Sequence, residues 1–362
     1  MAVLYGKEYS KKELMAKIGD ISQIAGVRLY QLSDGNQKGT DAVDFRTGSG
    51  FAFTVLPGRG LDISYAEFNG QPLCWRSHTG EIGPAFYEPA GLGWLRGFYG
   101  GLLVTCGMTN AGSPCVDEGK ELGLHGRMSY IPAKNVWADG EWQEDDYIMW
   151  VQGKVHEAVM FGDNVILTRK ILAKMGESKL YIHDMVENRG YESIPHMYLY
   201  HINGGFPVVD ENSVMLSPTK TAIPRDADAE VDSENYFKFQ TPTPEFSERV
   251  YYHDMVPDSE GYVYSALVNK QFRQGQGFGF YVKYLKSQLP KFVQWKMNGV
   301  GTYVIGMEPS NCWVEGRDKE RDRGTLQFLE AGEKREYNLE IGVLESNEMI
   351  DDLESKIKEQ LK

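Results

Sequence analysis

Long apolar runs are absent from this sequence. No stretch of its 362 residues approaches the roughly 20 consecutive apolar residues that a membrane-spanning helix requires. The N-terminal segment, MAVLYGKEYSKKELMAKIGD, also lacks the apolar core of a secretory signal peptide. We therefore expect a soluble, cytoplasmic protein that does not act at a membrane.

Basic clusters are missing as well. The chain has 38 Lys and Arg residues against 51 Asp and Glu residues, which gives a formal net charge of −13. Proteins that bind nucleic acids normally present a basic face to the phosphates, and anionic membranes attract basic segments. The composition therefore argues against both partners. It leaves a small molecule as the expected partner of a monomer or homodimer.

Cysteine is scarce, and its spacing excludes the common zinc motifs. Four cysteines lie far apart in the chain and form no C-x-x-C pair. In a long chain without a signal peptide, the default state of such residues is a buried free thiol. We expect this state for Cys74, Cys106, Cys115 and Cys312.

Several motifs that define large enzyme classes are also absent. The chain has no P-loop, no G-x-G-x-x-G after a strand, no H-E-x-x-H and no G-x-S-x-G elbow. His125, His201 and Glu308 are residue types that bind metals, but no close-spaced pair of ligands accompanies them. We therefore expect neither a metal nor a cofactor.

Segments typical of β-strands fill most of the chain between its ends. They are rich in β-branched and aromatic residues, several alternate apolar and polar positions, and Gly- or Pro-containing turns separate them. The absence of β–α alternation argues against a parallel sheet. We expect strands at 51–59, 164–174, 179–188, 196–204, 278–285, 301–309 and 336–345, and another near 100–106.

Helical signals occur only near the two ends. Ser10 is a suitable N-cap for a short helix over 10–19. Asn347 is a suitable N-cap for an amphipathic helix over 347–361.

The remaining organisation is simple. The polar, proline-containing stretch 208–260 favours a long loop region, and 78–120 is rich in glycine and aromatic residues. No repeat or linker divides the sequence. We therefore predict one all-β domain over residues 1–362.

Two histidines have a sequence context that suggests a site. His125 lies in GLHGR, where the glycines allow the backbone to approach a ligand closely. His201 lies near the end of a predicted strand in PHMYLYHINGGFP, and strand ends often form sites. His196 precedes it in the same strand by five residues, an odd number, so the two side chains should point to opposite faces. We interpret His78, His156 and His183 as structural or surface residues.

Glu308 is the most informative carboxylate. In GTYVIGMEPSN, alternation places Glu308 on the same strand face as Gly306, which leaves room for a ligand, and Pro309 should end the strand. A buried carboxylate is costly unless it is paired or used. An exposed carboxylate at a strand terminus would explain the residue equally well.

Two further polar groups are candidates. Arg59 and Asp62, in PGRGLDIS, could pair with each other or line a pocket, because the Arg fork suits hydroxyl-rich ligands. His253 and Asp254, in YYHDM, form a polar pair among aromatic residues.

Together these segments resemble a known family. LHGR, YHINGG and GMEPSN follow the order of three site motifs of the aldose 1-epimerases, or galactose mutarotases. The resemblance is closest to the DUF4432 branch of that superfamily, through PGRGLDI, LHGR, YHINGGFP, YYHD, QWKMNGVGTYVIGMEPSN and EGR, and it spans about residues 25–345. It implies a galactose mutarotase-like β super-sandwich with a sugar bound in a cleft of the larger sheet.

The resemblance also implies roles for individual residues. Glu308 would take the proton of the anomeric hydroxyl, His201 would protonate the ring oxygen, and His125 would help to stabilise that oxygen. A cleft in which Glu308 and His201 lie about 6–8 Å apart, with room for a sugar ring between them, would support this chemistry, whereas positions on opposite faces of a sheet would exclude it. Substrate contacts are expected from Arg59, Arg127, Asn203, His253, Asp254 and Lys296.

The sequence departs from mutarotases beside His201. Mutarotases have Asn before this His, whereas Tyr200 stands here. The resemblance as a whole implies an isomerase of carbohydrate metabolism that interconverts sugar anomers by acid–base ring opening. An epimerase acting at another sugar carbon and a non-catalytic sugar-binding or regulatory protein remain as alternatives.

Overall fold

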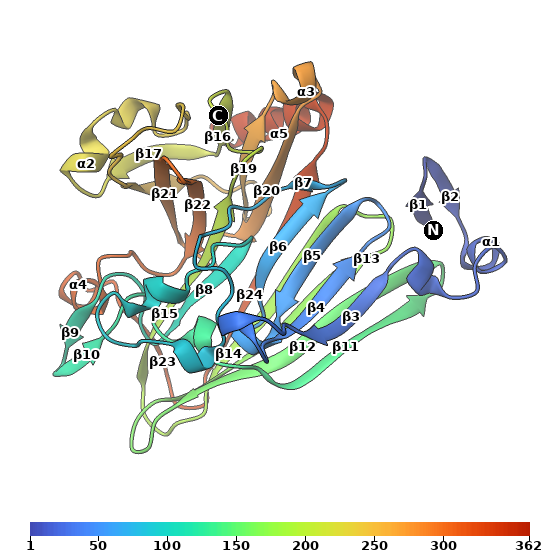
Figure 1. Cartoon of the computed structure of the whole chain (residues 1–362). Helices are drawn as coiled ribbons and strands as arrows, with labels where there is room; N and C mark the ends of the chain where they lie inside the picture. The colour runs from blue at the N-terminus through green and yellow to red at the C-terminus, as the bar shows by residue number, and fades with distance from the viewer.

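The computed structural model describes all 362 residues and consists mainly of two large antiparallel sheets (Figure 1). The sheet of eight strands has the order β11 (Lys134–Gln143), β12 (Asp146–Ala158), β13 (Asn164–Lys174), β14 (Lys179–Asn188), β24 (Lys334–Leu344), β20 (Phe278–Leu285), β19 (Tyr262–Asn269) and β16 (Ser213–Leu216). The predicted all-β sandwich is confirmed.

The sheet of 12 strands carries the candidate site. Its order is β17 (Thr219–Pro224), β18 (Arg249–Met255), β21 (Lys291–Gly299), β22 (Thr302–Ser310), β15 (Ile194–Gly204), β8 (Leu103–Met108), β6 (Asp62–Phe68), β5 (Phe51–Leu56), β4 (Asp41–Arg46) and β3 (Gly26–Gln31), with β7 (Gln71–Pro72) beside β6 and β23 (Gln327–Leu329) beside β15.

Short elements complete the chain. Two small hairpins are formed by β1 (Ala2–Leu4) with β2 (Lys7–Tyr9) and by β9 (Cys115–Asp117) with β10 (Lys120–Leu122). The helices are α1 (Lys11–Met15), α2 (Ala227–Glu230), α3 (Phe272–Gly275), α4 (Arg317–Asp322) and α5 (Asn347–Gln360). None of these helices is both long and apolar enough to cross a membrane.

The two faces of the larger sheet have different partners. One face packs on the smaller sheet through a core cluster of 55 buried residues, which includes Tyr198 and Tyr200 of β15. The opposite face packs under loops of the segment 73–131 through a second cluster of 16 buried residues, which includes Met197 and Leu199. Alternation along β15 thus sends its even-numbered residues into the sandwich and its odd-numbered residues toward the covering loops.

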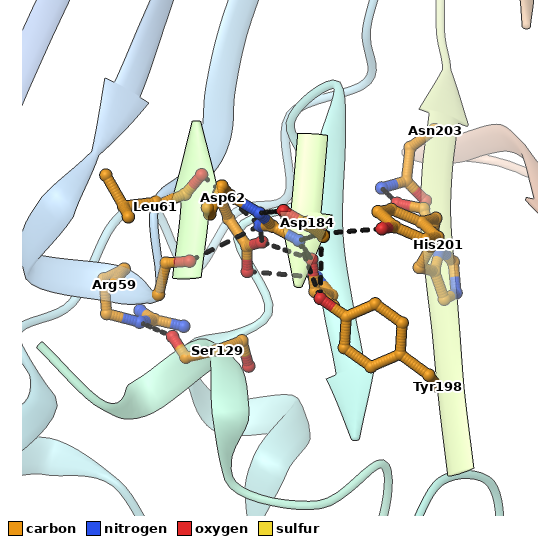
Figure 2. Close-up of polar contacts among 12 residues, drawn as sticks. Arg59, Leu61, Asp62, Ser129, Asp184, Tyr198, His201 and Asn203 are labelled. Carbon is orange, nitrogen blue, oxygen red and sulfur yellow. Dashed lines mark hydrogen bonds and ion pairs between the residues drawn. The ribbon is translucent and has the colours of Figure 1, made fainter. Parts of the chain in front are cut away.

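A buried charge network joins the two sheets (Figure 2). Arg169 on β13 donates from Nε and Nη2 to Asp184 on β14, at 2.9 and 2.7 Å, and from Nη1 to Asp62 on β6 at 2.9 Å. The hydroxyls of Tyr198 and Tyr200 both donate to Asp184. Asp62 therefore pairs with Arg169, not with Arg59, because its position on β6 faces the smaller sheet.

Most predicted strands agree with the structure, and the differences have local causes. The ranges 164–174, 179–188 and 278–285 coincide with β13, β14 and β20. The range 51–59 ends early, because Pro57–Arg59 turns into a short 3₁₀ helix after β5. All four cysteines are free, and Cys115 is partly exposed, unlike the other three.

The prediction that residues 208–260 form only loops is wrong. This stretch contains the helix α2 and the strands β16, β17 and β18. The three strands extend the two sheets. Short polar strands at sheet edges have weak hydrophobic alternation, so their sequence resembles that of a loop. The prediction that Pro309 ends its strand is also wrong, because β22 continues to Ser310.

The terminal helices are present but shorter than predicted. Ser10 caps α1 in a capping box with Glu13, yet the helix ends at Met15. The N-cap of α5 is Ser346, whose hydroxyl accepts from the backbone N–H of Met349. The side chain of Asn347 instead donates to backbone carbonyls of the neighbouring 270–275 segment.

Candidate active site

His201 and Glu308 meet at the centre of the larger sheet. His201 projects from β15 and Glu308 from the adjacent β22, and their residues are only 5% and 2% exposed. The distance from His201 Nε2 to Glu308 Oε1 is 3.3 Å. The backbone pairing of β15 with β22 skips the positions of these two residues between Leu199–Ser310 and Ile202–Met307. Proline lacks an N–H, so Pro309 fits the unpaired stretch.

The distance of 3.3 Å between His201 Nε2 and Glu308 Oε1 is shorter than the roughly 6–8 Å that would leave room for a sugar ring between the two groups. Gly306 explains the closer approach, because a Cβ atom there would lie 2.3 Å from Glu308 Oε1 and 3.1 Å from His201 Cε1. The glycine leaves space in which the Glu308 carboxyl group lies over the strand and reaches the imidazole. A ligand would have to lie across the pair rather than between its members.

The prediction from strand parity is confirmed. His196 points into the sandwich, where it makes a 2.7 Å hydrogen bond with the Tyr337 hydroxyl of β24. His201 points the other way, where its ring lies edge-on to Phe98 and Trp295. The two histidines of β15 thus belong to different layers.

Burial determines the charge state of the His201–Glu308 pair. It raises the pKa of Glu308 well above the ordinary value for a carboxyl group, and the neighbouring Glu248 carboxylate adds to this rise. It lowers the pKa of His201 to about 4. Both shifts disfavour the charged forms, so the pair consists of a carboxylic acid beside an uncharged imidazole, and the proton of the acid is the one available for transfer between the two groups.

His125 approaches the same pair from a covering loop. Its ring centroid lies 5.9 Å from that of His201, and its ring packs on Trp94. The backbone N–H of Gly112 donates to His125 Nδ1 at 3.3 Å, so the neutral ring carries its proton on Nε2. Burial and the neighbouring His201 lower the pKa of His125 to about 3. His125 is therefore an uncharged hydrogen-bond donor.

A pocket of about 540 Å³ opens above these three residues. This volume lies within the range of roughly 300–1,000 Å³ that is common for small-molecule sites. Its walls combine aromatic, aliphatic and polar side chains, an arrangement that suits a ligand with both CH faces and hydroxyl groups. Beside the three residues above, it is lined by Trp75, Ser77, His78, Thr79, Leu92, Trp94, Leu95, Phe98, Ser113, Pro114, Leu124, Arg225, Glu248, Val250, Val293, Trp295, Thr302 and Val314.

One wall consists of a polar group that the sequence did not reveal. Arg225 follows β17 and Glu248 precedes β18, and the pairing of these strands brings the two residues together. Glu248 accepts from Arg225 at 3.1 Å and from the indole N–H of Trp295 at 2.9 Å. Arg225 also donates to Asp226 at 2.7 Å. His78, interpreted from sequence as structural or superficial, also lines the pocket.

Arg59 does not reach the pocket. It is fully buried and donates to the backbone carbonyl of Ser129 at 2.6 Å (Figure 2). It also donates to the backbone carbonyls of Ile82 and Gly97, at 2.7 and 3.2 Å. Its guanidinium also stacks on Tyr130, 3.9 Å from the ring centroid. The residue holds the covering loops on the sheet, and all of its visible contacts are structural.

Four other expected substrate contacts also lie outside the pocket lining. Lys296 and His253 alternate with pocket-facing residues and point to the opposite face of the sheet. There Lys296 donates to the Asn235 carbonyl, and His253 bonds Thr219 and Gln294. Asp254 is exposed and pairs with Lys286 at 3.0 Å. Arg127 is exposed, with its guanidinium over Tyr87.

Asn203 lies beside the site without lining it. It is fully buried, and its amide donates to the backbone carbonyl of His201 at 3.1 Å. Of the nine predicted site residues, the pocket thus brings together His125, His201 and Glu308. No group of three or more His, Cys, Asp and Glu side chains converges in a way that could hold a metal ion.

Comparisons with known proteins agree with this architecture. The family model described as a domain of unknown function, DUF4432, matches residues 37–343. No curated protein matches the chain. The structure superposes on that of a candidate aldose 1-epimerase from Klebsiella pneumoniae with a TM-score of 0.89 and 24% identity, over 94% of this chain and 91% of the other.

More distant structures share the fold as well. A galactose mutarotase-like protein from Clostridium acetobutylicum has a TM-score of 0.61 and 12% identity, over 89% of this chain and 99% of its own. The galactose 1-epimerase from Lactobacillus acidophilus has a TM-score of 0.57 and 11% identity, with the same coverage of the two chains.

Proposed function

The chain belongs to the DUF4432 family and has a galactose mutarotase-like fold, and from this premise we propose that it is an isomerase that interconverts sugar anomers by acid–base ring opening. The observation that carries the proposal is the contact of His201 with Glu308 at the floor of an aromatic pocket. Relatives at this level of identity support the fold, so the chemistry is argued from the pair itself.

The pair matches the two proton transfers that anomer exchange requires. Ring opening removes a proton from the anomeric hydroxyl and adds one to the ring oxygen while the C1–O5 bond breaks. Both oxygens are attached to C1, so two catalytic atoms only 3.3 Å apart can reach them from one side of the sugar. The reaction needs proton transfer alone.

A single shared proton makes the cycle balance. Transfer of the Glu308 proton to His201 Nε2 produces a carboxylate beside an imidazolium. Glu308 then takes the anomeric proton and His201 gives its proton to the ring oxygen, which yields the open aldehyde and returns the pair to its neutral form. Reclosure on the other face of the carbonyl reverses these transfers and releases the other anomer.

His125 has a supporting role in this scheme. Its Nε2–H is fixed as a donor by the bond that Nδ1 accepts from Gly112, and its low pKa keeps it uncharged. An uncharged donor can stabilise charge on the ring oxygen without competing with His201 for the transferable proton. We therefore assign His125 to stabilisation of the ring oxygen.

Polarimetry on freshly dissolved α-D-hexoses and pentoses tests the proposal. The wild-type protein should speed the approach to the equilibrium rotation for at least one aldose, and Glu308→Gln should slow that catalysed rate by at least about 100-fold. Asp254→Asn is the matched control, because this exposed acid pairs with Lys286 outside the pocket. Sugar binding without rate enhancement by the wild-type protein would refute the proposal and favour a binding protein.

A further inference from the structure

Part of the pocket lining is apolar and exposed, although the exposed His78 and the half-exposed Glu248 also line the pocket. Leu92 and Leu95 line the pocket although their residues are 60% and 46% exposed. Pro114, Leu124 and Val314 continue this surface. We call these five residues the apolar rim. Exposure of leucine side chains to water is unfavourable in free energy. A patch of such side chains beside a binding site therefore indicates a ligand with an apolar group.

The rim is held in place by backbone hydrogen bonds between its segments. The N–H of Leu124 donates to Gly91 at 3.0 Å, and that of Ser113 donates to Val314 at 2.9 Å. A Cβ atom on Gly123 would lie 2.0 Å from the Pro89 carbonyl oxygen, so these segments are in close contact. The apolar surface is therefore preformed rather than assembled around a ligand.

The charges near the rim leave no free cation for an anionic substituent. Arg225 is the only Lys or Arg that lines the pocket, and its guanidinium is occupied by Asp226 and Glu248. At the surface, Arg96 pairs with Glu88 at 3.0 Å. A phosphate or carboxylate on the substrate would therefore find no Lys or Arg side chain in the pocket lining that is free of a carboxylate partner.

The pocket also exceeds the size of one monosaccharide. A volume of about 540 Å³ corresponds to about 18 water molecules at roughly 30 Å³ each, whereas a hexose has about 12 non-hydrogen atoms. Bonded atoms occupy less space than separate waters, so a hexose on the floor leaves room toward the rim. With C1 and O5 at the His201–Glu308 pair, the ring carbons that point toward the mouth are C3 and C4.

We propose that the substrate is an uncharged sugar that carries an apolar substituent, such as an aryl or alkyl group, on C3 or C4, and that the apolar rim binds this substituent. The inference rests on the proposed function for the placement of C1 and O5. It goes beyond that function because it names what distinguishes the substrate from a free hexose.

Equilibrium binding tests this proposal separately from catalysis. The probes are D-glucose, 4-O-benzyl-D-glucose and maltose, in which a second glucose replaces the benzyl group, together with D-galactose and its 4-O-benzyl ether. In titration calorimetry, the benzyl sugar that binds better should have a dissociation constant at least about tenfold below that of its parent hexose and at least about tenfold below that of maltose. The reason is that an aryl group buries more apolar surface than a few methylene groups do.

Leucine variants locate the preference on the rim. Leu92→Ser and Leu95→Ser should each weaken binding of the benzyl sugar by about three- to tenfold and weaken binding of the parent hexose by less, so that the ratio of the two affinities falls. Leu29→Ser is the matched control, because Leu29 is 58% exposed on the distant strand β3.

The outcomes separate the two proposals. Equal affinities for benzyl and parent sugars, tighter binding of maltose, or no binding of any probe would overturn this inference. A benzyl preference that both rim variants reduce supports it even if the protein catalyses no anomer exchange. Conversely, exchange of free hexoses without a benzyl preference would leave the proposed function standing and refute the inference about the rim.

Discussion

Gly306→Ala tests whether the close approach of Glu308 to His201 matters for the reaction. A Cβ atom at this position would lie 2.3 Å from Glu308 Oε1, whereas ordinary contacts begin near 3.4 Å. The carboxyl group must therefore move by about 1.1 Å, the difference between these two distances. The atom that must move ends a flexible side chain, so the strand itself can stay in place.

A displacement of about 1 Å at a reacting group can cost about 100-fold in rate. We therefore expect Gly306→Ala to lower kcat/KM for anomer exchange by about 100-fold, measured by polarimetry. Its free energy of unfolding should change by no more than about 1 kcal/mol, because the Ala side chain reduces the entropy of the unfolded chain while it crowds the Glu308 carboxyl group. Urea denaturation measures this second quantity.

A double-mutant cycle identifies the cause of the loss. In a Glu308→Gln background, Gly306→Ala should cost less than about threefold, because the displaced group no longer acts as a base. Full activity of Gly306→Ala, or an equal loss in both backgrounds, would refute the reasoning.

Three further predictions concern charge. The kcat/KM profile should fall below about pH 4, where His201 becomes protonated, because burial lowers its pKa to about 4. It should also fall at high pH, where Glu308 loses its proton, because burial raises the pKa of Glu308 well above its ordinary value. A rate that stays constant between about pH 5 and about pH 3 would contradict this. Arg169→Met should lower the free energy of unfolding by about 3–5 kcal/mol in urea, because Asp62 and Asp184 stay buried without their partner; a change under 1 kcal/mol would argue against the network. Arg59→Met should lower the free energy of unfolding by about 3 kcal/mol or more in urea, because it leaves three carbonyls of the covering loops unpaired; a change under about 1 kcal/mol would argue against this structural role.

The floor of the site could be predicted from sequence because it lies on strands. Strand alternation separates His201 from His196 and places Glu308 beside Gly306, and both relations hold in the structure. The order of the three family motifs along the chain suggested His125 as a third site residue. In the structure, the loop that carries His125 does bring its ring close to His201. The short distance between His201 and Glu308 could not be predicted from the sequence, because it depends on side-chain conformation, which strand periodicity does not encode.

The walls of the site could not be predicted in the same way. Arg225 and Glu248 meet because the ends of β17 and β18 are paired, and the polar stretch that contains these two strands resembled a loop in the sequence. Trp295 and Lys296 are adjacent in β21, but only the former faces the pocket, and nothing local shows which face the loops cover. The only available signal was the abundance of aromatic residues, which suits sugar binding without naming positions.

Arg59 illustrates a more general ambiguity. A charged residue in a turn after an apolar strand looks exposed, and its fork suits hydroxyl groups equally well as carbonyls. In the folded chain the guanidinium of Arg59 donates hydrogen bonds to three backbone carbonyls of the covering loops. Sequence shows the donor, whereas the acceptor depends on how distant loops pack.

The most direct test of the account is saturation transfer between the anomeric protons of a reactive aldose at neutral pH. The wild-type protein and His183→Asn, a matched variant of an exposed histidine bonded to Asn338, should transfer saturation equally. His201→Asn should bring the transfer down to the level without protein. Transfer by His201→Asn at the wild-type rate would contradict the claim that the His201–Glu308 pair interconverts sugar anomers.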